Sequence, residues 1–235
     1  MINFAHRGYS GLYPENTMLA FKKAIEIGAS GIELDVHLTK DKEIVIIHDE
    51  LLDRTTNGTG LVMDHTLKEL KTLNASILFS QYDIQQIPTL REYFELLAST
   101  NLITNIELKN SVIDYPGLEK EVYNLIKEYD IADKIIISSF NHESLVRMKA
   151  IDKSIKCGVL ESSRLHEPWN YIKNIGMDYY HPMNFVVTEE LAYKCKSNNI
   201  GLNIWFGISK WSYNEYLKFN PVGLITDFPE KVFDM

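Results

Sequence analysis

The sequence predicts an α/β fold, a (β/α)8 TIM-type barrel with a β-hairpin near residues 32–48 and a small insertion at about 50–88. Short apolar, β-branched runs alternate along the chain with segments of helical periodicity, which is the pattern of βα units in a parallel sheet. About eight such units in 235 residues match the size of a closed barrel. We therefore expect one domain over residues 1–235.

The expected elements follow from local composition. Apolar runs rich in Ile, Val, Leu and Tyr predict strands, and apolar residues spaced three or four apart predict helices. The expected strands are residues 2–5, 32–38, 44–48, 103–108, 134–138, 156–160, 179–182, 202–206 and 223–226. The expected helices lie near 15–27, 66–73, 89–99, 117–129, 142–151, 168–175, 188–197, 211–219 and 229–234.

Nine extended runs are one more than a barrel needs, and the second and third are separated by a tight turn at residues 39–42. A parallel crossover takes about a dozen residues, so these two runs should pair as an antiparallel hairpin. A turn centred on Asp41 would place His48 opposite Glu33 or Leu34.

The segment 50–88 is the least regular part of the chain, with a turn cluster at 57–60 and little periodicity from 76 to 88. We expect it to form a small excursion over the mouth of the barrel, because long insertions in compact domains are often functional.

Bulk properties exclude several classes of protein. A hydrophobic content of 45% with 24% charged residues is ordinary for a soluble globular protein. The net charge of −8 argues against nucleic acid or an anionic membrane as a partner. We find no signal peptide and no apolar run long enough to span a membrane, so we expect a cytoplasmic protein without stable membrane association. Cys157 and Cys195 are expected to be buried thiols. The oligomeric state is not predicted.

Two acids, Glu33 and Asp35, lie two residues apart in an apolar strand. Alternate side chains share one face of a strand, and two carboxylates on one buried face are costly unless a cation lies between them. A third acid, Glu107, lies in the fourth barrel strand. Three oxygen ligands predict one divalent metal ion, Mg²⁺ or Ca²⁺. The alternative is a structural ion-pair network with Arg7 and Lys109.

Other polar residues gather at the carboxyl ends of the predicted strands, where barrels of this kind carry their active sites. His6 and His48 are candidates for general acid and general base, although either can be a core residue. Arg7 and Lys109 are candidates for phosphate binding. The alternative for Arg7 is a plain salt bridge.

Four further positions have simpler interpretations. Glu15, after a proline, is interpreted as a first-turn acid of the helix near 15–27. Trp205 is either core packing or a wall for an apolar part of a substrate. His37 and His181 lie near strand ends and are interpreted as structural.

Together these residues resemble the glycerophosphodiester phosphodiesterase family. The matching pieces are Ala5-His6-Arg7-Gly8, Pro14-Glu15-Asn16-Thr17 with Ala20-Phe21, Gly31-Ile32-Glu33-Leu34-Asp35-Val36, Leu38-Thr39-Lys40-Asp41, Ile47-His48-Asp49, Asp53-Arg54-Thr55-Thr56 with Gly58 and Gly60, Ile87-Pro88-Thr89-Leu90, Ile106-Glu107-Leu108-Lys109, Ser138-Ser139-Phe140, Trp205, and Thr226-Asp227-Phe228-Pro229. Each piece alone is weak evidence for the family, whereas the N-terminal pieces together are highly specific for it.

The resemblance implies a phospholipase C-like barrel that cuts small glycerophosphodiesters to glycerol 3-phosphate and an alcohol. It implies the same metal ligands, histidine pair and phosphate-binding residues, with 50–88 as the family's insertion. The nucleophile is either water or the glycerol 2-hydroxyl. Alternatives are a same-fold phosphodiesterase for another lipid or headgroup, and a non-catalytic phosphodiester-binding protein. After Trp205 the family usually continues with Thr, an apolar residue and Asn, whereas this chain has Phe206-Gly207-Ile208-Ser209.

Overall fold

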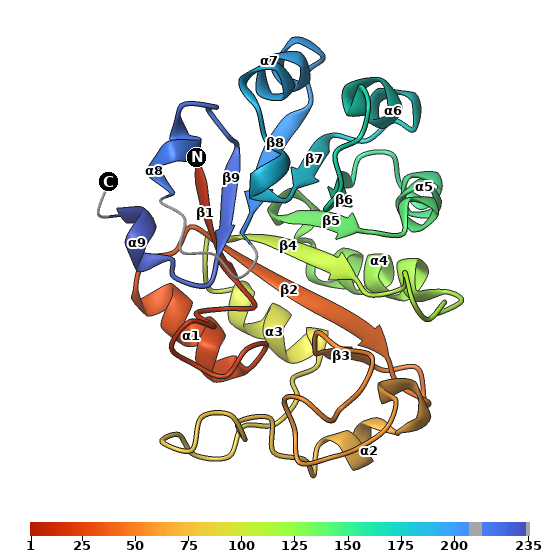
Figure 1. Cartoon of the computed structure of the whole chain (residues 1–235). Helices are drawn as coiled ribbons and strands as arrows, with labels where there is room; N and C mark the ends of the chain where they lie inside the picture. The colour runs from red at the N-terminus through yellow and green to blue at the C-terminus, as the bar shows by residue number, and fades with distance from the viewer. Residues whose placement is uncertain (207–212, 234–235) are drawn as a thin grey trace.

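A computed structural model describes residues 1–206 and 213–233, and within them the chain forms the predicted barrel (Figure 1). Eight parallel strands form a closed ring, because β1 pairs with both β2 and β9. The strands of the ring are β1 (Ile2–His6), β2 (Gly31–Leu38), β4 (Ile103–Leu108), β5 (Ile135–Ser139), β6 (Lys156–Glu161), β7 (Tyr179–Pro182), β8 (Gly201–Trp205) and β9 (Gly223–Thr226). Each predicted strand is present, with ends that differ by at most two residues.

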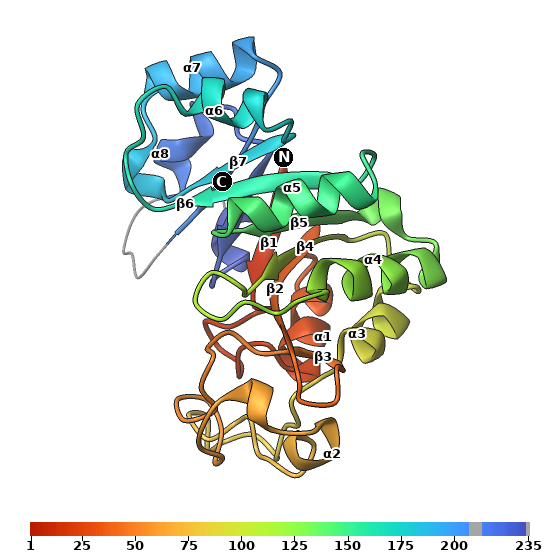
Figure 2. The same ribbon diagram turned by 90° about the vertical axis from the view of Figure 1, so that its right-hand side faces the viewer.

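Helices surround the ring of strands, apart from α2, which lies in the insertion (Figure 1 and Figure 2). They are α1 (Met18–Glu26), α2 (Leu67–Leu70), α3 (Leu90–Leu97), α4 (Leu118–Tyr129), α5 (His142–Ile151), α6 (Pro168–Asn174), α7 (Glu189–Ser197), α8 (Asn214–Leu217) and α9 (Glu230–Phe233). Most are shorter than predicted, and in α1, α2, α3, α5 and α7 the side chain of a Thr or Asn accepts a backbone N–H and defines the helix start. Thr17 does this for α1. Residues 211, 212 and 234 of the predicted helices lie outside the described part of the chain.

The predicted hairpin is present. Strand β3 (Ile44–Ile46) pairs antiparallel with β2, and the partners Val36 and Ile46 give the register of a turn centred on Asp41. Regular strand structure ends at Ile46, two residues earlier than expected, and the Ile46 N–H donates to the carbonyl of Pro88 on the side of β3 away from β2. The next residue, Ile47, still donates to the carbonyl of Asp35 at 3.1 Å, so the chain stays beside β2 as it approaches the histidine at position 48.

The insertion lies to one side of the barrel, near α1 and α3, and not over its mouth as expected (Figure 1 and Figure 2). It contains a 3-10 helix, η1 (Val62–Asp64), and α2. Alternate residues of the hairpin explain its position, since Ile44 and Ile46 join the main core whereas Val45 and Ile47 pack with the insertion. The insertion core comprises Val45, Ile47, Leu52, Val62, Leu70, Ala75 and Ile87.

Two faces of each barrel strand have different roles. On β2, Ile32, Leu34 and Val36 pack outward in the main core with side chains from the surrounding helices. The alternate residues of the strand, Glu33 and Asp35, therefore point into the ring. Cys157 and Cys195 are buried free thiols, as expected. In residues 1–206 and 213–233, no helix is long and apolar enough to cross a membrane.

The interior of the barrel holds a buried histidine, His181, on β7. The Asn203 amide donates to its Nε2 at 2.9 Å, and its ring occupies space that a Cβ at Gly158 would overlap. Burial lowers the pKa of His181 to about 3, so the ring is neutral in the folded protein.

We predict that His181 makes stability depend on pH. The unfolded chain protonates this residue below a pH of about 6.5, whereas the folded protein does so only near 3. The free energy of unfolding should therefore fall with decreasing pH, by about 2 kcal/mol between pH 7 and 5 from this residue alone.

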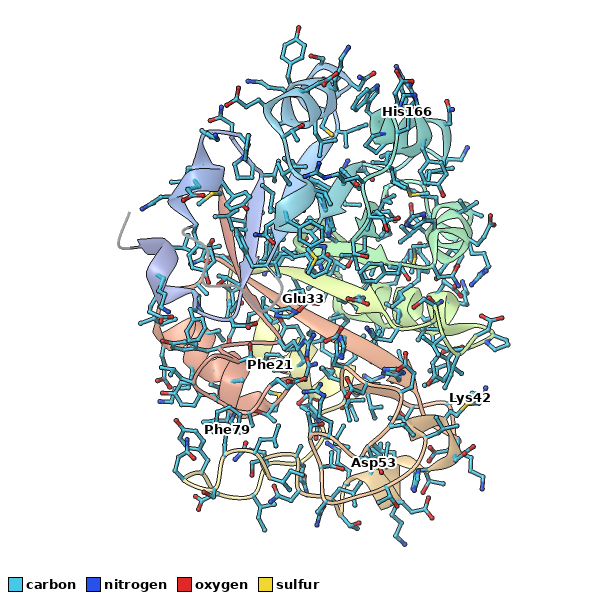
Figure 3. The ribbon with its side chains drawn as sticks, in the orientation of Figure 1. Phe21, Glu33, Lys42, Asp53, Phe79 and His166 are labelled. Atoms are coloured by element: carbon cyan, nitrogen blue, oxygen red, sulfur yellow. The ribbon has the colours of Figure 1, made fainter. Side chains whose placement is uncertain are left out.

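Urea unfolding at the two pH values measures this change. His181→Asn should lose most of that part of the pH dependence, whereas the exposed control His166→Asn, labelled on the periphery in Figure 3, should retain it. Equal pH dependence in all three proteins would contradict the prediction.

Candidate active site

A cavity of about 310 Å³ opens at the carboxyl ends of the barrel strands. Its charged and polar side chains come mainly from the ends of β1, β2, β3, β4 and β9, and its apolar side chains from β5, β6, β8 and β9. The polar lining residues are His6, Arg7, Ser10, Glu15, Glu33, His48, Asn105, Glu107 and Asp227. The apolar lining residues are Phe140, Leu160, Trp205, Phe206 and Ile225.

The three acids predicted from the sequence come together inside the ring. Glu33 and Asp35 share the inner face of β2, and Glu107 on β4 is the direct register partner of Asp35. Each offers a carboxylate oxygen, and these three atoms lie within 4.8 Å of one another. All three residues are buried, and Figure 3 shows Glu33 near the centre of the ring of strands.

The cations near these acids balance only part of the negative charge. Arg7 Nε lies 3.6 Å from Asp35 Oδ2, and Lys109 Nζ lies 3.0 Å from Glu107 Oε1, so the ion pairs of the alternative interpretation are present. Burial and the charge of Asp35 nevertheless raise the pKa of Glu33 to about 8. Asp35 Oδ1 is buried without a hydrogen-bond partner. Buried carboxylate oxygens in excess of nearby cations fit the ligand set of a hard divalent cation.

His6 is held at the end of β1 by two acids. Its Nδ1–H donates to Asp227 Oδ1 at 2.6 Å, and its Nε2 lies 3.9 Å from Glu33 Oε2. Burial and Arg7 favour a lower pKa for His6, but Asp227 and Glu33 outweigh them and raise it. The Ser10 hydroxyl also donates to Asp227, at 3.1 Å. The imidazole therefore has a fixed orientation, with Nδ1 toward Asp227 and Nε2 toward Glu33.

His48 has a similar arrangement on the opposite side. Its Nδ1–H donates to Asp49 Oδ1 at 2.5 Å, and Lys109 Nζ donates to its Nε2 at 3.2 Å. The ring of His37 donates from Nε2 to the carbonyl of His48 at 3.1 Å, so His37 has the structural role that the sequence suggested. Burial lowers the pKa of His37 to about 4 and keeps that ring neutral.

Arg7 occupies an unusual backbone conformation directly after β1. Its φ is 54°, in the left-handed region that few non-glycine residues adopt. The next residue, Gly8, has a φ of 79°, and a Cβ there would lie 2.8 Å from Ala20. The turn directs the Arg7 N–H to Glu33 Oε2 at 3.0 Å and its Nη1 to Glu15 Oε1 at 2.9 Å.

The interpretation of Glu15 as a first-turn acid is wrong, because α1 begins at Met18 and Glu15 lies before it. Free of the helix, this side chain reaches Arg7 and also Arg54 of the insertion. The Arg54 contact was not foreseen, because nothing in the spacing of the insertion indicates where it packs. Asp49 and Asp227 were also absent from the predicted site, although each follows a strand end.

Lys109 and Trp205 occupy different parts of the site. Lys109 lies between Glu107 and His48 and is not among the described residues that line the cavity. Trp205 lines the apolar side, where its ring packs edge to face with Phe140 at 6.1 Å between centroids. Its Nε1–H donates to the carbonyl of His181 at 3.0 Å. This geometry favours the wall over plain core packing.

The segment after the tryptophan departs from the family pattern in the sequence, and residues 207–209 of that segment lie outside the described part of the chain. The neighbouring Phe206 is buried and packs edge to face on Tyr213 and Tyr216.

Comparison with known proteins identifies the family. Residues 6–231 match the model of the glycerophosphoryl diester phosphodiesterase family. The chain belongs to this family. The family and the barrel fold predicted from the sequence are therefore confirmed.

Related proteins agree over nearly the whole chain. A glycerophosphodiester phosphodiesterase of Caldanaerobacter subterraneus is 44% identical over 98% of this chain and 96% of the relative. One from Bacillus altitudinis is 41% identical over 97% and 95% of the two chains. A phosphodiesterase from Oleispira antarctica, solved in complex with the product sn-glycerol-3-phosphate, is 28% identical, with a TM-score of 0.88 over 98% of this chain and 94% of the other.

Proposed function

We propose that this protein hydrolyses glycerophosphodiesters to glycerol 3-phosphate and an alcohol, with one divalent metal ion and a pair of histidines. The observation that carries the proposal is a cluster of three buried carboxylates at one cavity, which two aspartate-bound histidines also line. Family membership and the product held by the Oleispira relative support the substrate class.

Glu33, Asp35 and Glu107 would hold the metal ion. Their oxygen-only set favours Mg²⁺ or Ca²⁺ over zinc, and the unpartnered Asp35 Oδ1 together with the raised pKa of Glu33 fits a cationic ligand there. Such an ion, when bound, polarises the phosphate and neutralises charge that develops on its oxygens.

Arg7 and Lys109 bind and orient the phosphate in this proposal. Arg7 lines the cavity and carries a planar set of donors that suits phosphate oxygens. Lys109 adds positive charge beside Glu107, and its Nζ lies 3.2 Å from His48 Nε2. It thus links phosphate binding to one of the two histidines.

His6 and His48 move the protons. One takes a proton from the nucleophile, and the other gives a proton to the leaving alcohol. Asp227 and Asp49 hold the two Nδ1–H groups, so each Nε2 is the atom that exchanges a proton, and His48 Nε2 gives up its hydrogen bond from Lys109 when it does so. The same pair serves attack by water, or attack by the glycerol 2-hydroxyl followed by hydrolysis of the cyclic phosphate.

The apolar side of the cavity determines which alcohol fits. Trp205 would be the wall for the carbon skeleton of the substrate, with Phe140 and Leu160 beside it. This surface favours, as a second candidate, a diester whose alcohol or lipid portion is more apolar than that of a simple glycerophosphodiester. A purely binding function is disfavoured, because both histidines and all three acids are present. A cytoplasmic location stays an expectation from the sequence.

Removal of divalent ions should abolish activity. We expect no glycerol 3-phosphate release from several glycerophosphodiesters after exhaustive chelation, and recovery on addition of Mg²⁺ or Ca²⁺. Asp35→Asn should weaken metal affinity, measured by calorimetry, by at least about tenfold. The surface control Glu128→Gln should bind metal normally. Full activity in chelator would rule out a catalytic ion, and ligand binding without release under any condition would favour a binding protein.

Loss of either histidine should slow the reaction without preventing folding. We expect His6→Ala and His48→Ala each to lower kcat by roughly 10²–10⁴, the usual contribution of a general acid or base. The exposed His166→Ala serves as the control and should retain wild-type kcat. Near-wild-type turnover in either active-site variant would refute the two-histidine scheme.

A further inference from the structure

One side chain of the insertion, Arg54, reaches the edge of the active site and bridges two acids. Its Nε and Nη2 donate to the two Asp49 oxygens at 2.6 and 3.0 Å. Its Nη1 and Nη2 donate to the two Glu15 oxygens at 2.8 and 2.7 Å. Such paired hydrogen bonds fix both the position and the plane of a carboxylate.

Each of the two acids holds a residue of the proposed machinery. Asp49 Oδ1 accepts from His48 Nδ1–H as well as from Arg54. Glu15 Oε1 accepts from Arg7 Nη1 as well as from Arg54. The guanidinium therefore lies at the centre of a chain of contacts that runs from His48 to Arg7.

The backbone that carries Arg54 is fixed by the insertion itself. The N–H and the hydroxyl of Thr56 both donate to the carbonyl of Leu52, at 3.1 and 2.7 Å. Leu52 is fully buried in the insertion core. This local turn, together with the core beneath it, sets where the arginine can reach.

We propose that Arg54 is a positioning residue, which fixes His48 through Asp49 and Arg7 through Glu15 and so ties the insertion to the reaction. The inference rests on the proposed roles of His48 and Arg7. Arg54 itself does not contact the acids that would hold the metal, and it acts only through its two partners.

Arg54 is a poor candidate for a purely structural role. Its side chain is 41% exposed, so water screens its paired contacts with Glu15 and Asp49, and we expect these contacts to add only modestly to stability. Its removal should therefore change catalysis much more than unfolding. Arg91 offers a matched control, because it forms a comparable two-bond pair with Glu128 between α3 and α4, and neither residue lines the cavity.

The test measures kcat and KM for glycerol 3-phosphate release by the metal-loaded full chain. We expect Arg54→Ala to lower kcat on the order of 10- to 100-fold, because small misplacements of catalytic groups have effects of this size. Arg54→Lys, which keeps the charge but not the paired donors, should recover only part of the loss. Arg91→Ala should match the wild type, and thermal unfolding midpoints of Arg54→Ala and Arg91→Ala should be similar.

The two contacts of Arg54 can be separated. Asp49→Asn should mainly lower kcat, through His48, and Glu15→Gln should mainly raise KM, through Arg7. If Arg54 acts through Asp49, the double variant Arg54→Ala/Asp49→Asn should lose no more kcat than the more damaging single variant. Additive losses, or wild-type kcat in Arg54→Ala, would overturn the positioning role.

These outcomes are distinct from a failure of the proposed function. When the wild type releases product and His48→Ala does not, the function stands and only the role of Arg54 is in question. Absence of release from the wild type with either metal would overturn both proposals.

Discussion

Mutual repulsion among Glu33, Asp35 and Glu107 is the constraint around which the mouth of this barrel is organised. Three buried carboxylates with one oxygen each within 4.8 Å of the others are unfavourable, and surrounding groups offset that cost. Arg7 and Lys109 supply positive charge, and Asn16 donates an amide hydrogen bond to Asp35. The remaining imbalance is what makes the cluster suited to a divalent cation.

The need to offset this repulsion also explains the backbone conformation around β1. The left-handed conformations of Arg7 and Asn16 direct an N–H, a guanidinium and an amide toward the acids of β2. Such conformations persist only where surrounding contacts hold them. Farther out, aspartates hold the two histidines. Charge therefore alternates outward from the carboxylate cluster, and each group fixes the orientation of the next.

Much of this could be predicted from the sequence, because it depends on short-range rules. Strand alternation placed Glu33 and Asp35 on one face, and the position of the turn at Asp41 determined the hairpin register. The features that could not be predicted from the sequence depend on tertiary contacts. The periodicity near Glu15 resembles a helix start, but Thr17 caps the helix, and Arg54 lies in a segment whose packing no local pattern specifies.

The hairpin strand β3 belongs to two hydrophobic cores, with Ile46 facing the barrel and Val45 and Ile47 facing the insertion. Its far end leads directly into His48. Proteins open in cooperative segments of unequal stability, and a small satellite core is the kind of unit that opens first. Local opening of the insertion would release one face of this strand while the barrel stays folded. If the smaller core opens first on heating, the segment that leads into His48 loses one of its two packing partners, and heat inactivation would then precede unfolding of the barrel.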